Sequence, residues 1–186
     1  SRYRGRDDFC DPFCGSGTIP IEAALIAKNR APGLNRDFTA MNWSIFDRSV
    51  WQQARDEARS KEFHGDYNIV GSDIDPKVIE IARENARRAG VDDVVRFEVA
   101  DATKFDRRTE RGVIVTNPPY GERIMEKQQA EELYRGFGRA WLASENWQLY
   151  LLSSHTEFER CFGKQADKKR KLYNGMIKCD LFMYFK

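Results

Sequence analysis

Apolar residues follow two periods along this chain, and the two periods alternate. Short and nearly continuous apolar runs are typical of strands buried in a parallel sheet, and apolar residues spaced three and four apart are typical of helices packed on one side. Strands are expected at 9–10, 67–73, 94–99, 112–116 and 147–152. Helices are expected at 18–28, 47–61, 76–90, 126–144 and 156–162. This alternation predicts an α/β fold built on a mostly parallel sheet.

The end of the chain breaks the alternation. Two strand-like runs, 171–173 and 177–185, follow each other with no helical pattern between them. Asn174 and Gly175 lie in the gap, and Asn-Gly is the strongest short signal for a hairpin. We therefore expect the parallel sheet to end in an antiparallel hairpin.

A segment between the first two expected strands is rich in aromatic residues. Residues 29–42 contain proline, glycine and asparagine at loop-like spacing, and Trp43, Phe46 and Trp51 follow them. Large aromatic side chains usually find a buried surface. We therefore expect this segment to fold back onto the domain.

Composition narrows the class of protein. The chain has 186 residues, of which 41% are hydrophobic and 32% charged, so residues 1–186 are expected to form one globular domain. No apolar run approaches the length of a membrane helix. The basic first residues lead into no apolar signal segment. These features predict a cytoplasmic protein with no membrane partner.

Cysteine and histidine give no sign of a metal centre. The four cysteines form no C-x-x-C pair, and His64 and His155 lie far apart in the sequence. The cysteines are therefore expected to be free thiols in a reducing compartment, and no metal ligand is expected. The net charge of +2 neither predicts nor excludes nucleic acid as a partner.

The first candidate for chemistry is the loop from Asp11 to Thr18. A short apolar strand runs into Asp11 and Pro12, and Gly15 and Gly17 follow before a helix begins. Such a turn after the first strand is where open α/β sheets bind nucleotide-like ligands. The loop lacks both G-x-G-x-x-G and the P-loop pattern, so S-adenosylmethionine fits better than a phosphate-bearing cofactor. A glycine turn in an ordinary strand–helix unit would look the same.

Acidic residues stand at three successive strand ends. They are Asp11, Asp73 and Asp101, and parallel strands bring such ends to one edge of the sheet. Asp73, with Asp75 as the alternative, suits ribose hydroxyls, and Ile74 suits the adenine face. Asp101 suits the adenine amino group. The alternative is that these acids cap helices, as Asp75 before a proline is well placed to do.

The most specific motif follows the 112–116 strand. It reads Asn117-Pro118-Pro119-Tyr120, and it suits the methylation of an exocyclic amine. The Asn117 amide oxygen and the Pro118 carbonyl can accept both amine protons, because consecutive prolines fix the backbone and direct its carbonyls outward. Tyr120 offers a flat face on which a flipped base can stack. The alternative is a Pro-Pro turn with a packing tyrosine.

Charged residues beyond this motif are less specific. Arg123 is expected to position a substrate phosphate or to pair with Glu122. A basic run at Lys164 and 168–171 suits RNA phosphates. A solvated face explains that run equally well.

Five segments of the chain resemble one known family. They are 11–24, 31–36, 71–75, 117–123 and 168–175, and they resemble the RlmL-type ribosomal RNA guanine-N2 methyltransferases of bacteria. Such sequences are also often described as N6-adenine-specific DNA methylases, because they share the Asn-Pro-Pro-Tyr motif. The resemblance covers essentially the whole chain.

The resemblance implies a class I Rossmann-like, S-adenosylmethionine-dependent methyltransferase that acts on large-subunit (23S) ribosomal RNA. It implies a seven-stranded sheet whose last hairpin is antiparallel. The implied cofactor residues are Asp11, Gly15, Gly17, Asp73 and Asp101, and Phe13 and Ile74 are expected to bind the cofactor beside them. The implied target-site residues are 117–120, of which Asn117, Pro118 and Tyr120 are expected to be catalytic and Pro119 to bind substrate. Arg123 is expected to bind substrate in its positioning role.

Other functions compete with this one. Full-length relatives carry an N-terminal RNA-binding THUMP region and a pocket-closing segment, so the chain is expected to be a catalytic domain alone. Adenine-N6 methylation of DNA is the main alternative, because the motif serves either amine. A nicotinamide dehydrogenase would need G-x-G-x-x-G, and a non-catalytic binding module would leave the Asn117 motif unexplained.

Overall fold

A seven-stranded sheet forms the centre of the computed structural model, which describes residues 1, 3–107, 109, 111–121, 124–144 and 146–185. Its strands are β1 (Asp8–Asp11), β2 (Ile69–Asp73), β3 (Val95–Val99), β4 (Gly112–Thr116), β5 (Trp147–Ser153), β6 (Lys168–Asn174) and β7 (Ile177–Tyr184). They lie in the order β3-β2-β1-β4-β5-β7-β6. The first five strands are parallel, and β7 pairs antiparallel with β5 and β6. The expected class I Rossmann-like fold, with its terminal antiparallel hairpin, is confirmed.

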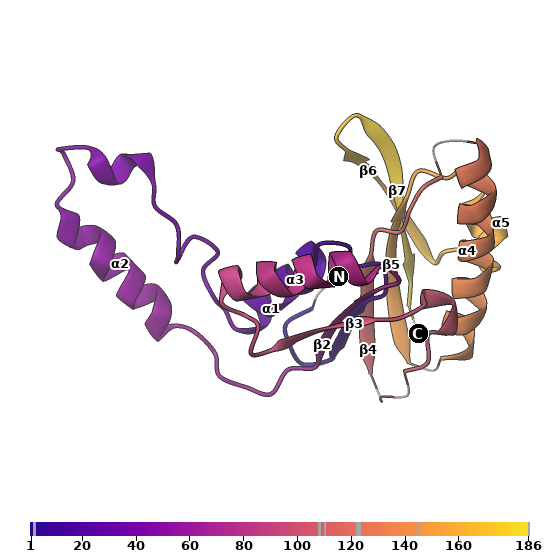
Figure 1. The fold of residues 1–186 in the computed structure, drawn as a ribbon, viewed down its shortest axis with the longest axis horizontal. Helices are drawn as coiled ribbons and strands as arrows, with labels where there is room; N and C mark the ends of the chain where they lie inside the picture. The colour runs from indigo at the N-terminus through magenta and orange to yellow at the C-terminus, as the bar shows by residue number, and fades with distance from the viewer. Residues whose placement is uncertain (2, 108, 110, 122–123, 145, 186) are drawn as a thin grey trace.

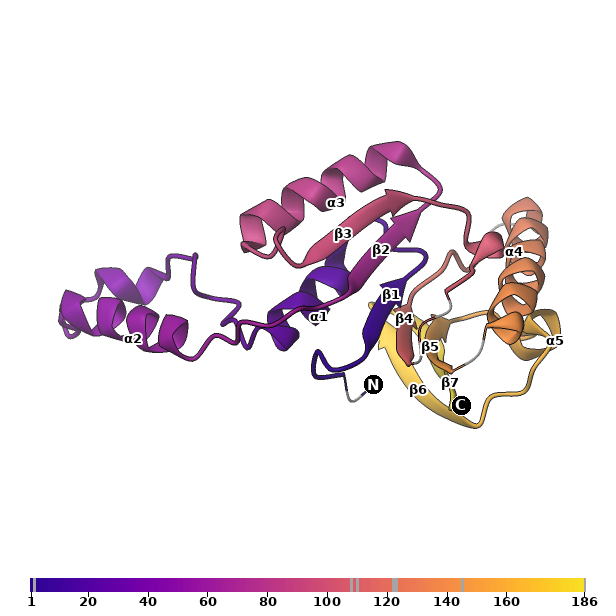
Figure 2. The ribbon, with the colours of Figure 1, turned by 90° about the horizontal axis from the view of Figure 1, so that it is seen from below.

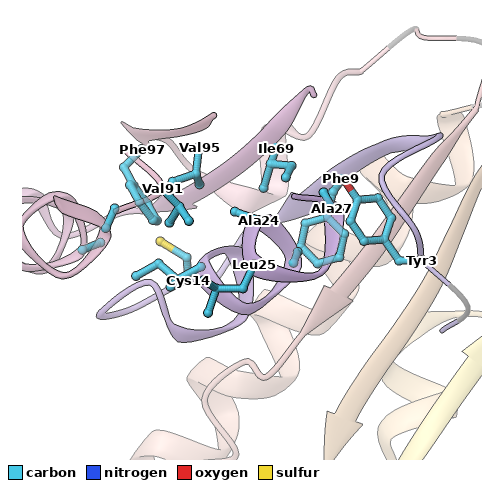
Figure 3. Close-up of a cluster of buried hydrophobic side chains, with 14 of the residues drawn as sticks. Tyr3, Phe9, Cys14, Ala24, Leu25, Ala27, Ile69, Val91, Val95 and Phe97 are labelled. Carbon is cyan, nitrogen blue, oxygen red and sulfur yellow. The ribbon is translucent and has the colours of Figure 1, made fainter. Parts of the chain in front are cut away.

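Helices cover both faces of the sheet (Figures 1 and 2). The helices are α1 (Thr18–Ala27), α2 (Arg48–Ser60), α3 (Pro76–Ala89), α4 (Ile124–Ala143) and α5 (Phe158–Phe162), with short 3-10 turns η1 (Thr39–Asn42) and η2 (Ala102–Lys104). One core joins α1 and α3 to β1, β2 and β3, and it includes Phe9, Leu25 and Phe97 (Figure 3). The other core lies under α4 and α5 and is mostly aromatic. The four cysteines are buried and free, as expected.

The sheet order places a crevice at the carboxyl ends of β1 and β4. Connections from β1 lead to β2 on one side, whereas β4 lies on the other side of β1. Ligands of open α/β sheets bind where the strand order reverses in this way. The fold therefore brings the loops after β1, β2, β3 and β4 to one place.

Local signals explain where the helices around this crevice begin. Asp75 caps α3 by accepting a hydrogen bond from the Lys77 amide at 2.8 Å, and Pro76 occupies the first turn. Gly17 precedes α1 with φ of +85°, and a Cβ atom there would lie 2.8 Å from the Phe97 ring. Only glycine combines this backbone conformation with so close an approach.

The terminal hairpin is longer than predicted, and its turn is shifted by one residue. Asn174 pairs with Ile177, so the turn consists of Gly175 and Met176. Gly175 has φ of +60°, which a glycine-first hairpin turn requires. Strand β6 begins at Lys168 because an outermost strand has an exposed face that accepts charged side chains.

One expectation about the fold is wrong. Residues 35–63, here called the arm, extend away from the sheet and carry α2 at a distance from the core (Figures 1 and 2). Trp43 and Ile45 are 55% and 78% exposed. The aromatic rings stack on one another within the arm, with 6.0 Å between the Phe38 and Trp51 centroids. These local contacts take the place of the packing against the domain that the aromatic residues were expected to make.

Candidate active site

A pocket of about 440 Å³ lies at the carboxyl edge of the sheet. This volume is within the range of small-molecule sites. Its lining residues are Pro12, Phe13, Gly15, Asp73, Ile74, Ala100, Asp101, Ala102, Asn117, Pro118, Pro119, Tyr120 and Leu133. Nine of the residues predicted from sequence are thus together on one pocket. Asp11 and Gly17 do not line it, and Arg123 and Glu122 lie outside the described residues.

The glycine loop forms one wall of the pocket. The Gly15 amide donates a hydrogen bond to Asp73 Oδ2 at 3.0 Å, which ties the loop after β1 to the end of β2. Gly15 has φ of +50°, and a Cβ atom there would meet no atom within 4 Å. The backbone at Gly15 therefore borders open space into which a ligand can approach.

Asp11 lies beneath this wall instead of facing the pocket. Its side chain is buried, and Oδ1 accepts hydrogen bonds from Thr116 Oγ1 at 2.6 Å and from the Phe13 amide at 3.1 Å. Burial raises the pKa of Asp11 to about 7, although both hydrogen bonds act in the opposite direction. Asp11 therefore joins the carboxyl ends of β1 and β4 and shapes the loop.

The structure gives different positions to Asp73 and Asp75, the two carboxylates near the end of β2 that the sequence left as alternatives for the ribose site. Asp73 reaches the pocket, and its Oδ1 accepts a hydrogen bond from the Asp75 amide at 3.1 Å. Asp75 is exposed and caps α3. Ile74 is 71% exposed at the pocket rim. An apolar side chain this exposed beside a pocket is suited to cover an apolar ligand face.

Asp101 reaches the pocket from the end of β3. Its Oδ1 accepts hydrogen bonds from the Thr103 amide at 2.9 Å and from Thr103 Oγ1 at 2.7 Å. These bonds lower the pKa of Asp101, so the carboxylate is charged at neutral pH. Oδ2 lies 3.8 Å from Lys104 Nζ, in an ion pair whose lysine side chain is mostly exposed.

The Asn-Pro-Pro-Tyr segment forms the opposite wall. Asn117 is exposed, and its Oδ1 accepts a hydrogen bond from Tyr120 Oη. Asn174, from the hairpin, donates to the same Tyr120 oxygen at 3.3 Å. The Pro119 carbonyl accepts from Tyr134 Oη at 2.6 Å, which fixes the segment to α4. Burial raises the pKa of Tyr120 to about 12, so its hydroxyl is neutral at physiological pH.

Some pocket residues were not predicted from the sequence. Ala100 and Ala102 flank Asp101, and their small size at a strand end was a usable sign of close ligand approach. Leu133 comes from the middle of α4. In sequence it is one apolar position among many on that helix, so only the fold assigns it to the pocket.

The described part of the chain also bears on metals and membranes. Within it, no group of three or more histidine, cysteine, aspartate or glutamate side chains is placed to hold a metal ion. None of its helices is both long enough and apolar enough to cross a membrane.

The fold and the pocket together define a Rossmann-like methyltransferase domain. The chain belongs to the family described as the RMKL-like methyltransferase domain, which it matches over residues 1–182. The resemblance seen in the motifs is thereby confirmed.

Two relatives show how much of a longer protein this domain spans. YpsC of Bacillus subtilis, provisionally named an RNA methyltransferase, is 46% identical over 178 residues, which are 95% of this chain and 46% of YpsC. The ribosomal RNA large subunit methyltransferase K/L of Shewanella amazonensis is 41% identical over 180 residues, which are 94% of this chain and 25% of that protein. The chain therefore spans less than half of these relatives.

Solved structures agree with the fold. A possible methylase from Clostridium difficile 630 has a TM-score of 0.94 at 48% identity, over 99% of this chain and 49% of that one. SMU.472, solved with SAH, has a TM-score of 0.94 at 40% identity, over 100% of this chain and 49% of that one. A predicted N6-adenine-specific DNA methylase from Listeria monocytogenes has a TM-score of 0.93 at 43% identity, over 100% and 48%. SAH is the demethylated form of S-adenosylmethionine, the expected cofactor.

Proposed function

We propose that the protein transfers a methyl group from S-adenosylmethionine to the exocyclic N2 amine of a guanine in large-subunit ribosomal RNA. The observation that carries this proposal is the exposed Asn117 carboxamide, which lies on the same pocket as Asp73 and Ile74. RNA is favoured over DNA because YpsC and methyltransferase K/L carry RNA methyltransferase names.

One half of the pocket fits the adenosine part of the cofactor. Asp73 would accept hydrogen bonds from the ribose hydroxyls, and the exposed Ile74 would cover an adenine face. Asp101 Oδ2 would accept from the adenine amino group, because Oδ1 is already occupied by Thr103. The open space above Gly15 leaves room for the rest of the molecule. When bound, S-adenosylmethionine supplies an electrophilic methyl group, whose transfer forms an N–C bond, breaks the S–C bond and leaves the electron pair on sulfur.

The other half prepares the amine. Asn117 Oδ1 and the Pro118 carbonyl would each accept one amine proton, which draws the nitrogen lone pair out of the ring system and toward the cofactor. After transfer the nitrogen carries one surplus proton, which passes from its hydrogen bond with Asn117 to water. Tyr120 remains a neutral phenol, because its pKa is about 12. Its ring would hold the base by stacking.

One bond must change before the amine can bind. Tyr120 Oη donates to Asn117 Oδ1, the same oxygen that the amine would use. The substrate must therefore compete with the tyrosine hydroxyl for Asn117. The Asn117 side chain can turn away from the hydroxyl, which frees its oxygen for the amine while the ring of Tyr120 stays in place for stacking.

The second candidate is methylation of adenine N6 in DNA. It is favoured by the name of the Listeria structure, and Asn117 and Pro118 would hold an adenine amine in the same way. The two proposals differ in the product and not in the pocket residues.

Mass spectrometry of nucleosides separates the two. The protein is incubated with labelled S-adenosylmethionine and either undermethylated ribosomal RNA or DNA. We expect labelled N2-methylguanosine from the RNA. Labelled N6-methyladenine alone, from either nucleic acid, would contradict the proposal and support the second candidate.

A further inference from the structure

The β6–β7 hairpin reaches the active site through one side chain. Asn174, the last residue of β6, donates from Nδ2 to Tyr120 Oη at 3.3 Å, although 54 positions separate the two in sequence. Figure 1 shows the hairpin extending beyond the sheet at the end where α4 begins. The turn of the hairpin therefore lies beside the Asn-Pro-Pro-Tyr segment.

Positive charge is concentrated on this hairpin. Residues 168–184 hold five basic residues and one acidic residue, whereas the whole chain has a net charge of only +2. Lys169 is committed to an ion pair with Glu159, at 2.7 Å. Lys171 and Lys178 are exposed close to the turn. The hairpin is thus more positive than the rest of the molecule taken together.

The hairpin turn also exposes apolar surface. Tyr173 is 72% exposed and Met176 is 99% exposed. Lysines on an outermost strand are often a protection against pairing with other sheets. That explanation alone does not account for an exposed ring and an exposed thioether side chain at the tip, because exposed apolar groups favour the association that such lysines prevent. A flat ring between lysines is a typical arrangement for binding single-stranded nucleic acid.

We propose that the hairpin is the RNA-contacting element of the active site and that Asn174 is a positioning residue for Tyr120. The basic side chains bind phosphates next to the target nucleotide, and Tyr173 stacks on a neighbouring unpaired base. This inference rests on the proposed function, because it takes the nucleotide in the Asn117 pocket as the reacting one.

The contact through Asn174 explains how the hairpin acts on the site. Tyr120 Oη both accepts from Asn174 and donates to Asn117. The hairpin that binds RNA is therefore connected, through the hydrogen bond from Asn174, to the Tyr120 hydroxyl that occupies Asn117 Oδ1. Asn174 holds the tyrosine hydroxyl while Asn117 turns to the amine, so the ring stays in place for stacking.

The first experiment tests RNA binding. Lys171→Gln with Lys178→Gln is compared with Arg87→Gln and Arg88→Gln, which remove the same charge at the end of α3 opposite Asp73. We expect the hairpin variant to raise KM for RNA about tenfold. The slope of log binding constant against log salt concentration should become shallower by about 1.4, because two phosphate contacts are lost. The control should keep parental values. Equal behaviour of the two variants would overturn the inference.

The second experiment tests Asn174. Asn174→Asp keeps the shape of the side chain but removes the donor, so we expect kcat to fall about tenfold with KM nearly unchanged. The same change in a Tyr120→Phe background should have no further effect, because the hydroxyl it positions is gone. Parental kcat in Asn174→Asp, or an equal loss in the Tyr120→Phe background, would overturn the positioning role.

RNA binding tests this inference and methylation tests the proposed function, so the failure of one can be told from the failure of the other. Parental RNA binding that depends on the hairpin, without any methylated RNA, would contradict the proposed function and leave the hairpin as a binding element. Methylated RNA from the parent, with hairpin variants that match the α3 control, would support the proposed function and refute this inference. Stronger dependence on Lys171 and Lys178 for DNA than for matched RNA would refute the choice of RNA as the partner.

Discussion

Asp11 couples the stability of the site to pH. Its folded pKa of about 7 lies above the ordinary value of 3.8, so the folded protein binds a proton more tightly than the unfolded chain. The stability linked to this proton is complete below about pH 4 and is lost as the pH rises toward 7. We expect Asp11→Asn to match the parent near pH 4 and to be more stable by about 1–4 kcal/mol at pH 8. Urea unfolding at several pH values measures this, and a constant difference would contradict it.

Asp73 carries the prediction for cofactor binding. We expect Asp73→Ala to weaken S-adenosylmethionine binding by about 1–3 kcal/mol, through loss of a charge-assisted hydrogen bond. Asp75→Ala is the matched control two residues away. It should lower stability by about 0.5–2 kcal/mol, because it removes the cap of α3, and leave affinity unchanged. Calorimetry in which only Asp75→Ala loses affinity would exchange the two roles.

Asn117 carries the prediction for chemistry. Its carboxamide is exposed on the pocket wall that follows β4, whereas Asp73 ends β2 and Ile74 follows that strand. We expect Asn117→Ala to lower kcat by about 10²–10³-fold, as for other groups that act mainly on the transition state. Cofactor affinity should stay near the parental value. Single-turnover assays with saturating cofactor measure this, and a parental rate would remove Asn117 from the reaction.

At the scale of elements, the two glycines of the loop have different tasks. A methyl group at Gly17 would meet Phe97 at 2.8 Å, whereas one at Gly15 would meet nothing within 4 Å. We expect Gly17→Ala to cost about 2–4 kcal/mol of stability, from strain and overpacking. Gly15→Ala should cost about 1 kcal/mol, because only the backbone is strained. Its larger effect should be weaker cofactor binding. Thermal unfolding with and without the cofactor measures both the loss of stability and the loss of cofactor binding for each variant. A larger loss of stability in Gly15→Ala than in Gly17→Ala would contradict the prediction.

The elements also show how far sequence alone predicts the structure. Strand β4 was predicted at its observed bounds, because Gly112 and the two prolines after Asn117 mark both ends. Asp11 resembled the other strand-end acids, and its burial depends on Thr116, which is 105 residues away. The arm was misplaced because Trp43 and Phe46 pack on each other, and sequence does not show which partner an aromatic residue finds.

At the scale of the whole molecule, the sheet assembles the pocket from distant segments, but charge is spread unevenly. The net charge of +2 gives little long-range attraction for RNA, although residues 168–184 of the β6–β7 hairpin hold five basic residues and one acidic residue. RNA affinity comes largely from phosphate contacts that salt weakens. Under the proposed function, flipping a structured base would cost a few kcal/mol, and stacking on Tyr120 would return about 1–3 kcal/mol. These two contributions nearly cancel, so further RNA contacts are needed.

We therefore predict that the 186-residue chain folds and binds cofactor but methylates RNA slowly at physiological salt. Relatives such as YpsC are more than twice as long as the matched segment, and we expect the additional length to supply further RNA-binding surface. The measurement compares the turnover of this chain with that of YpsC, as a relative of greater length, on the same RNA at low and at physiological salt. We expect the longer chain to lose much less activity as salt rises. Equal turnover of both chains at physiological salt would show that the domain supplies its own RNA recognition. Replacing Lys171 and Lys178 with glutamine should then remove nearly all of the RNA binding.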